Sequence, residues 1–314
     1  MTVKKFNYVR FVICIVVLVG VIVGVVKLVG HINYTKTYEY KLLKAGYNEE
    51  EVKVIDSKLK NEVKDKVISE KYNEYLVPFI KEPYFIYSHL DEYIRYFKDH
   101  DTDYRNTVAI INTEANVDWI DNEKETDTSK NELMLVNRLY GLSEDYKVED
   151  IVDVPTKYAY SGKKISQSIL DNIIDLCESA KTEGYTFVVS DGFRSYKDQN
   201  DLYNSYANNY GKMEADKIVA RPGHSEYETG LSFNLEIYGK NYDNYEVSPE
   251  YIWLKDNAYK FGFIFRFPKD KEDITLFEPD LFRLRYVGIE ASTIINREDI
   301  CFEEYYAYYV RGEK

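Results

Sequence analysis

Residues 220–237 read ARPGHSEYETGLSFNLEI, and the end of this stretch decides the fold class. From Leu231 onward apolar and polar side chains alternate, which is the period of a strand with one buried face. Three other segments have the composition of strands: YTFVVS ending at Ser190, FIFRF from Phe263 and RLRYV from Arg283. The sequence therefore predicts four strands in this part of the chain.

Helical patterns lie between these strands. Apolar residues recur at helical spacing over about 165–181, and Gly184 is placed to end that helix. Ser248 and Pro249 open a second helix that runs through Lys260. Helices interspersed with strands in this way predict a mixed α+β domain.

The segment 33–105 carries mainly helical signals. Asn48, followed by three glutamates, opens one helix, and Ser88 ahead of LDEYIRYF opens another. We interpret 33–105 as a helical stalk or subdomain, with the main domain over 106–314. Within that domain the short apolar run TVAIIN from Thr107 is interpreted as a strand, and the polar stretch 121–132 as a loop.

An uninterrupted apolar run, FVICIVVLVGVIVGVV, occupies residues 11–26 and continues through Ile32. Its length approaches the roughly 20 residues that a membrane-spanning helix needs. A buried core helix or a cleaved signal peptide is the alternative, but no clear A-x-A cleavage pattern follows. Basic residues precede the run: Lys4, Lys5 and Arg10. We expect an anchor over 11–32, a cytoplasmic tail over 1–10 and the remainder on the extracytoplasmic side of the cell membrane.

Charge and cysteine content exclude two classes of protein. The chain of 314 residues has a formal net charge of −13, which disfavours nucleic acid as a partner because phosphate binding needs clustered Lys and Arg. Its three cysteines, Cys14, Cys177 and Cys301, lie far apart with no C-x-x-C spacing. Neither a zinc finger nor a disulfide-rich scaffold is indicated.

Over about residues 134–290 the sequence resembles the VanY-like D-Ala-D-Ala carboxypeptidases, zinc peptidases that trim the stem peptide of peptidoglycan. SDGFRSYKDQ from Ser190 is similar to SGYRS-x-x-x-Q, and the stretch 220–237 is similar to RPGxSEHQTGLAVD. WLKDNAYKFGFIFRFP from Trp253 follows, and ITLFEPDLFRLRYVG from Ile274 resembles ITGxxxEPWHxRYVG. DTSKNELMLVNRLYGLSEDY from Asp127 resembles the family's lead-in. The resemblance implies a mixed helix and antiparallel-sheet domain of the zinc D,D-peptidase type.

The resemblance also implies a zinc site, but this chain departs from it at every ligand. In the family a His and an Asp of SxHxxGxAxD and the His of ExWH hold zinc, and the Glu of ExWH is the general base. The matching positions here are Tyr227, Asn234, Arg283 and, for the base, Asp280. A protonated Tyr and a neutral Asn are poor ligands, and Arg is a permanent cation that repels zinc. We therefore expect no metal cofactor.

Histidine content leads to the same expectation without any alignment. His224 is the only histidine beyond residue 106, so a zinc site with two imidazoles cannot form there. One alternative is a site built from Glu226, Glu228, Glu236 and Asp280, since carboxylates suit Mg²⁺ or Ca²⁺ better than zinc.

The substrate-binding half of the site is better preserved. Arg194 matches the Arg that helps to stabilise bound substrate in the family, and Gln199 and Ser225 would supply hydrogen bonds to a peptide end. His224 is a further candidate for binding. Each has a structural alternative: a surface salt bridge for Arg194, capping or packing for Gln199 and Ser225, and a hydrogen-bonded structural role for His224.

Three functions remain open at the level of the sequence. The favoured hypothesis is a membrane-anchored, non-catalytic relative that binds the peptidoglycan stem peptide or regulates at the cell wall. The second is an active D,D-carboxypeptidase with an atypical site. The third is a structural ectodomain that binds a membrane partner through the segment 33–105.

Overall fold

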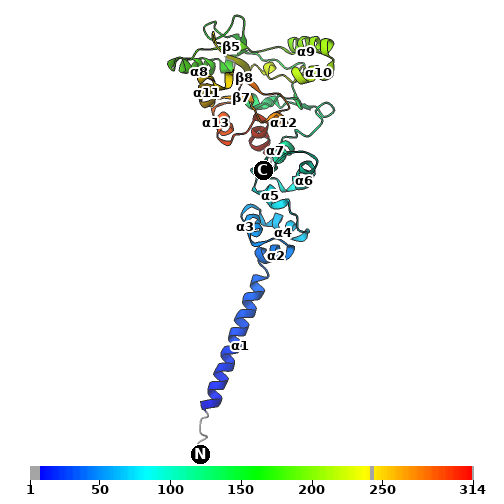
Figure 1. Ribbon diagram of the computed structural model, residues 1–314, viewed down its shortest axis with the longest axis vertical. Coiled ribbons are helices and arrows are strands. Elements are labelled where there is room, and N and C mark those ends of the chain that lie inside the picture. Colours follow the sequence, from blue (N-terminus) through cyan, green and yellow to red (C-terminus); the bar gives the residue numbers. More distant parts are fainter. Residues whose placement is uncertain (1–7, 241–243, 313–314) are drawn as a thin grey trace, which may run out of the picture. The chain divides into compact units, whose positions relative to one another are not determined.

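The structure is a computed structural model that describes residues 8–240 and 244–312. It divides into two compact units, residues 1–108 and 109–314 (Figure 1). The first unit is helical in its described part. Its helices are α1 (Tyr8–Tyr34), α2 (Tyr38–Ala45), α3 (Glu49–Lys58), α4 (Asn61–Ser69), α5 (Leu76–Lys81) and α6 (Leu90–Asp99), and α7 (Tyr104–Asn112) crosses the division between the units.

Helix α1 contains the apolar run identified in the sequence. It has 27 residues, which at a rise of 1.5 Å per residue gives a length of about 40 Å. That length and its apolar composition are sufficient for a helix to cross a bilayer, and a signal sequence near the amino terminus meets the same criteria.

The helix predicted after Asn48 is confirmed and its local cause is visible. The Asn48 side chain accepts hydrogen bonds from the N–H groups of Glu50 and Glu51, and the Glu51 carboxylate accepts the N–H of Asn48. This reciprocal capping satisfies amides that have no partner inside the helix. The strand predicted at TVAIIN is wrong, because 107–112 belong to α7, where the Thr107 hydroxyl donates to the Asp103 carbonyl one turn earlier.

The second unit mixes helices and strands. Its strands are β1 (Lys124–Glu125), β2 (Tyr140–Gly141), β3 (Ile151–Asp153), β4 (Lys164–Ser166), β5 (Phe187–Asp191), β6 (Ser232–Ile237), β7 (Phe263–Phe267) and β8 (Asp280–Tyr286). Its helices are α8 (Leu170–Thr182), α9 (Tyr196–Tyr210), α10 (Lys212–Ile218), α11 (Pro249–Asn257), α12 (Glu272–Thr275), α13 (Ile289–Glu298) and α14 (Phe302–Tyr305). The four strands predicted from the sequence correspond to β5, β6, β7 and β8.

The main sheet has the order β5-β6-β8-β7, and all three pairings are antiparallel. The predicted α+β class with an antiparallel sheet is therefore confirmed. The register places Asn234 of β6 directly opposite Arg283 of β8, and Ser232 opposite Arg285. Side chains that lie 49 residues apart in the sequence, Asn234 and Arg283, thus meet on adjacent strands.

Helix α8 packs against this sheet and supplies much of the core. Ile173, Leu176 and Ala180 are fully buried against Phe233 and Leu235 of β6 and their neighbours. Burial of one such aliphatic side chain is worth about 1.5–3 kcal/mol. The helix begins at Leu170 rather than near residue 165, because Ile165 pairs with Val152 in the β3–β4 ladder.

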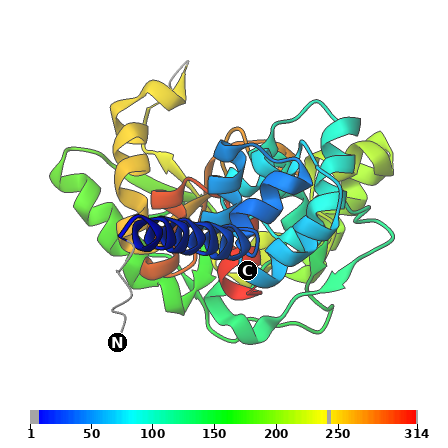
Figure 2. The same ribbon diagram turned by 90° about the horizontal axis from the view of Figure 1, so that it is seen from below.

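The two ends of the domain differ. Figures 1 and 2 show α8 and α11 together at one end and the α9–α10 pair at the other. Gly184, with φ of +85°, follows the last turn of α8 as predicted.

Helix α9 was not predicted from the sequence, although Ser195 caps it by accepting the N–H of Asp198.

Candidate functional site

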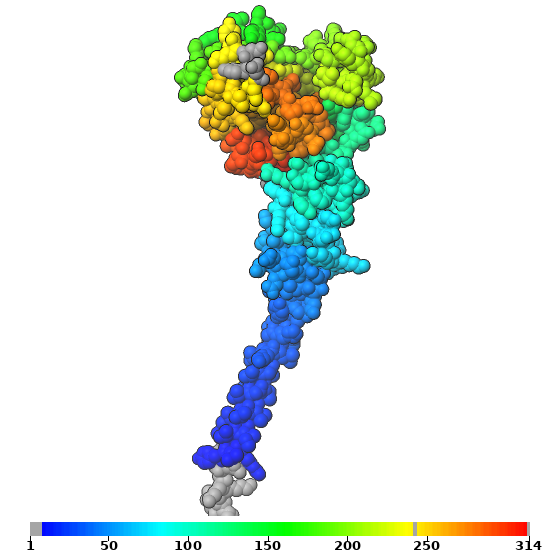
Figure 3. Space-filling view, viewed as in Figure 1, coloured from blue at the N-terminus to red at the C-terminus, as the bar shows by residue number. Residues whose placement is uncertain are grey.

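A cavity of about 630 Å³ lies in the second unit between the α9–α10 pair and the segment 277–283. Figure 3 shows these two segments on one face, in yellow-green and orange. The floor comes from the end of β5, the turn over 224–227 and Asn234 of β6. The four positions that match the family's ligands and base line this cavity, as do the four candidates for binding: Tyr227, Asn234, Asp280, Arg283, Arg194, Gln199, His224 and Ser225.

The three positions that match metal ligands are joined to one another. The Tyr227 hydroxyl donates to Asn234 Oδ1 over 2.8 Å, and Arg283 Nε donates to the same oxygen over 3.0 Å. The Arg283 guanidinium also lies over the Tyr227 ring, 4.1 Å from its centroid. This is a compact hydrogen-bonded cluster with one shared acceptor.

The position that matches the general base is also engaged. Asp280 Oδ2 lies 3.1 Å from Arg283 Nη2, and its Oδ1 accepts the backbone N–H groups of Phe282 and Arg283. Arg283 is therefore paired with Asp280.

Arg194 enters the cavity after β5 and is held from two directions. Its Nη2 lies 2.9 Å from Asp191, and its Nη1 donates to Gln199 Oε1 over 2.8 Å. Gln199 is fixed in turn, because its amide donates to the Ala220 carbonyl over 2.7 Å. The Arg194 guanidinium lies 4.8 Å from the Tyr227 ring centroid, so two guanidinium groups stack on this one ring.

His224 and Ser225 stand on the turn that precedes Tyr227. His224 Nδ1 lies 2.7 Å from the Asn137 carbonyl oxygen, and its Nε2 lies 3.2 Å from Glu123. The ring packs on Gly141, where an added Cβ would come within 2.8 Å of it. Both ring nitrogens therefore face oxygens of the protein.

The electrostatics of the cluster favour hydrogen bonding over metal ligation. Burial raises the pKa of Tyr227 to about 12, against the opposing attraction of Arg283. The phenol therefore stays protonated near neutral pH and donates its hydrogen to Asn234. A phenol, an amide oxygen that already accepts two hydrogen bonds, and a guanidinium do not form a donor set that fits zinc.

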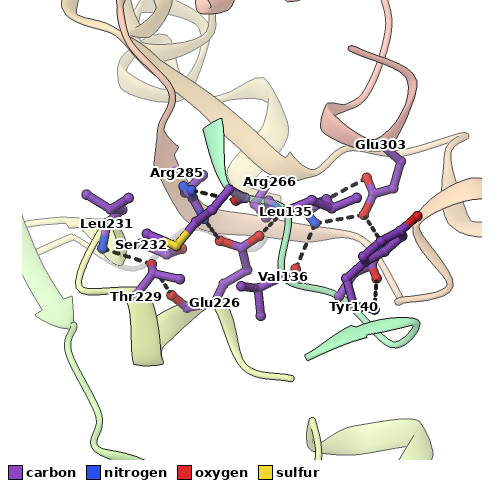
Figure 4. A network of polar contacts seen from close by, with 12 residues as sticks. Leu135, Val136, Tyr140, Glu226, Thr229, Leu231, Ser232, Arg266, Arg285 and Glu303 are labelled. Atoms are coloured by element: carbon purple, nitrogen blue, oxygen red, sulfur yellow. Dashed lines mark hydrogen bonds and ion pairs between the residues drawn. The ribbon is translucent and has the colours of Figure 1, made fainter. Parts of the chain in front are cut away.

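The alternative carboxylate site is wrong in its geometry. Among residues 8–240 and 244–312, no group of three or more His, Cys, Asp or Glu side chains gathers to hold a metal. Glu226 is instead neutralised by the guanidinium groups of Arg266 and Arg285 (Figure 4). Burial raises the pKa of Glu226, but the two arginines outweigh burial and leave it below the ordinary value.

This buried network extends beyond the cavity. Arg266 also pairs with Glu303 through two hydrogen bonds of 2.7 and 3.0 Å, and Arg285 donates to the carbonyls of Glu132 and Met134. Two cations thus face two anions with almost no exposure to solvent. This network was not predicted from the sequence. Its signal was arginine inside two predicted strands, Arg266 in FIFRF and Arg285 in RLRYV.

Comparison with known proteins finds the same family that the sequence resembles. The sequence model of the VanY family, described as D-alanyl-D-alanine carboxypeptidase, matches residues 162–289. The protein YodJ of Bacillus subtilis, named as a carboxypeptidase, is 35% identical over 184 residues, which cover 56% of this chain and 67% of YodJ. The chain belongs to the VanY-like D-alanyl-D-alanine carboxypeptidase family.

Two further relatives support this assignment. A D-alanyl-D-alanine carboxypeptidase of Enterococcus faecalis is 34% identical over 182 residues, which cover 55% of this chain and 65% of that protein. The solved structure of the LD-carboxypeptidase LdcB superposes with a TM-score of 0.55 at 33% identity, over 59% of this chain and 89% of LdcB. The family model begins at residue 162, so the first unit, residues 1–108, lies outside the segment that it matches.

Proposed function

We propose that this chain is a membrane-anchored, VanY-like protein of the cell wall whose cavity binds a peptidoglycan stem peptide without hydrolysing it. The observation that carries the proposal is the bonded cluster of Tyr227, Asn234 and Arg283 at the three positions of the family's zinc ligands. Asp280, at the position of the general base, is committed to Arg283.

Hydrolysis by the family's chemistry needs three protein ligands and a metal-activated water. The Tyr227 hydroxyl and the Arg283 guanidinium are donors where lone pairs are required. Asp280 accepts two backbone N–H groups and pairs with the Arg283 guanidinium, which holds its carboxylate within this cluster. These side chains support a pocket that recognises a ligand by hydrogen bonds.

Several features support peptide binding. The cavity volume of about 630 Å³ suits a short peptide end. Arg194 remains at the position of the family's substrate-stabilising arginine, and Gln199 holds its guanidinium in place. A peptide carboxylate would be received by Arg194 and Arg283, with Ser225 at the cavity wall.

The anchor is the second part of the proposal. Residues 11–32 of helix α1 would span the membrane, with residues 1–10 in the cytoplasm, as Lys4, Lys5 and Arg10 favour. The VanY-like domain would then face the cell wall, where stem peptides are found.

The test uses the full-length protein purified in detergent. We expect no stoichiometric zinc and no release of D-alanine from stem peptides, together with saturable binding of peptides that end in D-Ala-D-Ala. Bound zinc with chelator-sensitive release of D-alanine would establish the active enzyme instead. Absence of both hydrolysis and binding would favour a structural ectodomain.

A restored variant is the positive control for this test. Tyr227→His, Asn234→Asp, Asp280→Glu and Arg283→His together rebuild the family's set of ligands and base. We expect this variant to take up zinc that the unsubstituted protein does not retain, measured as metal content after dialysis.

A further inference from the structure

Two glutamates on the same turn have opposite electrostatic surroundings. Glu226 and Glu228 are both buried, with exposed fractions of 2% and 4%. Glu226 is neutralised by two arginines, whereas Glu228 makes no salt bridge with any residue that the structure describes. The resembling family pattern has Gln at the position of Glu228, so the negative charge here departs from that pattern.

Glu228 has no counter-ion within salt-bridge distance among the described residues, and Arg194 acts on its charge only from further away. Its carboxylate accepts the N–H of Gly223 over 2.9 and 3.2 Å and the N–H of Ser225 over 3.3 Å. A carboxylate offers about four acceptor sites, so these bonds do not saturate it. Burial raises the pKa of Glu228 to about 7, against the lowering effect of these hydrogen bonds.

Glu228 lines a second cavity of about 240 Å³. Of the lining residues that the structure describes, none is shared with the larger cavity. The walls include three aromatic rings, Tyr146, Phe193 and Tyr196, and the rim carries Lys147 and Glu149. The volume is below the usual range for a whole drug-sized ligand but sufficient for one side chain or a small amine.

We propose that this second cavity binds a primary ammonium group, with the Glu228 carboxylate as its counter-ion and the aromatic rings around its alkyl chain. An ammonium is attracted by ring faces and forms charge-assisted hydrogen bonds with a carboxylate. The ammonium would neutralise Glu228, as Arg266 and Arg285 neutralise Glu226. This site does not depend on the proposed function of the larger cavity.

The test is titration of the full-length protein in detergent by calorimetry, at pH 8, with Nα-acetyl-L-lysine methylamide. The control ligand is the corresponding norleucine derivative, which has a similar alkyl chain but no ammonium group. We expect saturable binding of the lysine derivative and none of the norleucine derivative. Equal binding of the two would overturn the proposal. Butylammonium distinguishes the two sources of an ammonium group. Affinity equal to that of the lysine derivative indicates a free amine as the ligand, and weaker affinity indicates a lysine side chain of a peptide.

The affinity depends on pH through the ionisation of Glu228. Between pH 8 and pH 6 we expect affinity to fall about tenfold, while the ligand stays charged because alkylamines titrate near 10.4. Arg194, Lys147 and Glu149 also face Glu228 or its cavity. The lining rings are acted on by further charges, Glu123 and Glu144 at Tyr196 and Asp150 and Arg285 at Tyr146. A flat profile across this range would refute the assignment of Glu228 as counter-ion.

Substitution separates Glu228 from the rim. Glu228→Gln keeps an oxygen for the N–H groups of Gly223 and Ser225, and we expect at least a tenfold loss of affinity at pH 8. Glu149→Gln removes the same charge at an exposed position, and we expect less than a threefold loss. Unchanged binding by Glu228→Gln would overturn the proposal. None of these assays uses peptides that end in D-alanine. A negative result would therefore refute the ammonium site and leave the proposed function of the larger cavity untouched.

Discussion

Replacing Glu228 by glutamine is expected to stabilise the folded protein above neutral pH and to leave it unchanged in acid. Burial raises the pKa of this carboxyl from 4.5 to about 7, despite the hydrogen bonds from Gly223 and Ser225. Folding therefore disfavours the ionised form, whereas an amide has no charge at any pH. Oε1 accepts the shorter of the two bonds from the Gly223 N–H and the bond from the Ser225 N–H, and the glutamine oxygen can take its place.

The magnitude follows from the linkage between protonation and folding. Below pH 4.5 the carboxyl of Glu228 is protonated in the folded and unfolded chains, so it makes no difference to stability. As the pH rises to about 7, the unfolded chain releases the proton and the folded chain retains it. The unsubstituted protein thus loses about 3 kcal/mol over this window, because each pH unit is worth about 1.4 kcal/mol.

The assay is thermal denaturation of full-length protein in detergent, followed by circular dichroism at pH 4.5 and pH 8. For a domain of this size, about 3 kcal/mol corresponds to a Tm difference of about 6–12 °C at pH 8. The control is Glu149→Gln, whose exposed position predicts little change at either pH. A stability difference that is the same at both pH values, or a destabilised variant at pH 8, would refute the reasoning.

Three further outcomes are expected. Arg283→Ala should lower the free energy of unfolding by about 1–2 kcal/mol in denaturant titrations, because Asp280 loses its partner but is partly exposed to water. A loss above about 4 kcal/mol would contradict this. Arg266→Met should cost about 3–5 kcal/mol, because Glu303 is left buried and unpaired, whereas Arg297→Met on the surface should cost little; equal losses would contradict the buried network. Full-length protein should remain with membranes after carbonate washing, and recovery in the soluble fraction would count against the anchor.

The strands of the main sheet could be predicted from sequence because each has a pattern that fits one structure. The alternation from Leu231 gave β6, and the apolar run ending at Ser190 gave β5. The segment 107–112 could not be assigned in the same way. A short apolar run buried on successive residues fits a strand and a helix equally, and its tertiary surroundings decide.

The site was predictable in position but not in its bonding. Motif positions placed Tyr227, Asn234 and Arg283 together, and the register of β6 with β8 brings them into contact. The role of Glu228 was not predictable, because it depends on burial and on rings from distant segments. Tyr146 and Tyr196 reach the second cavity from positions on both sides of the first predicted strand.

The buried arginine network sets a minimum autonomous folding unit that is longer than the segment matched by the family model. The family match ends at residue 289, but Arg266 needs Glu303 and the Val136 carbonyl, and Arg285 needs the Glu132 carbonyl. A fragment cut to 162–289 would bury two guanidinium groups against the single carboxylate of Glu226. Domain boundaries drawn from sequence similarity alone would therefore yield an unstable fragment, and a fragment that folds must span at least 132–303.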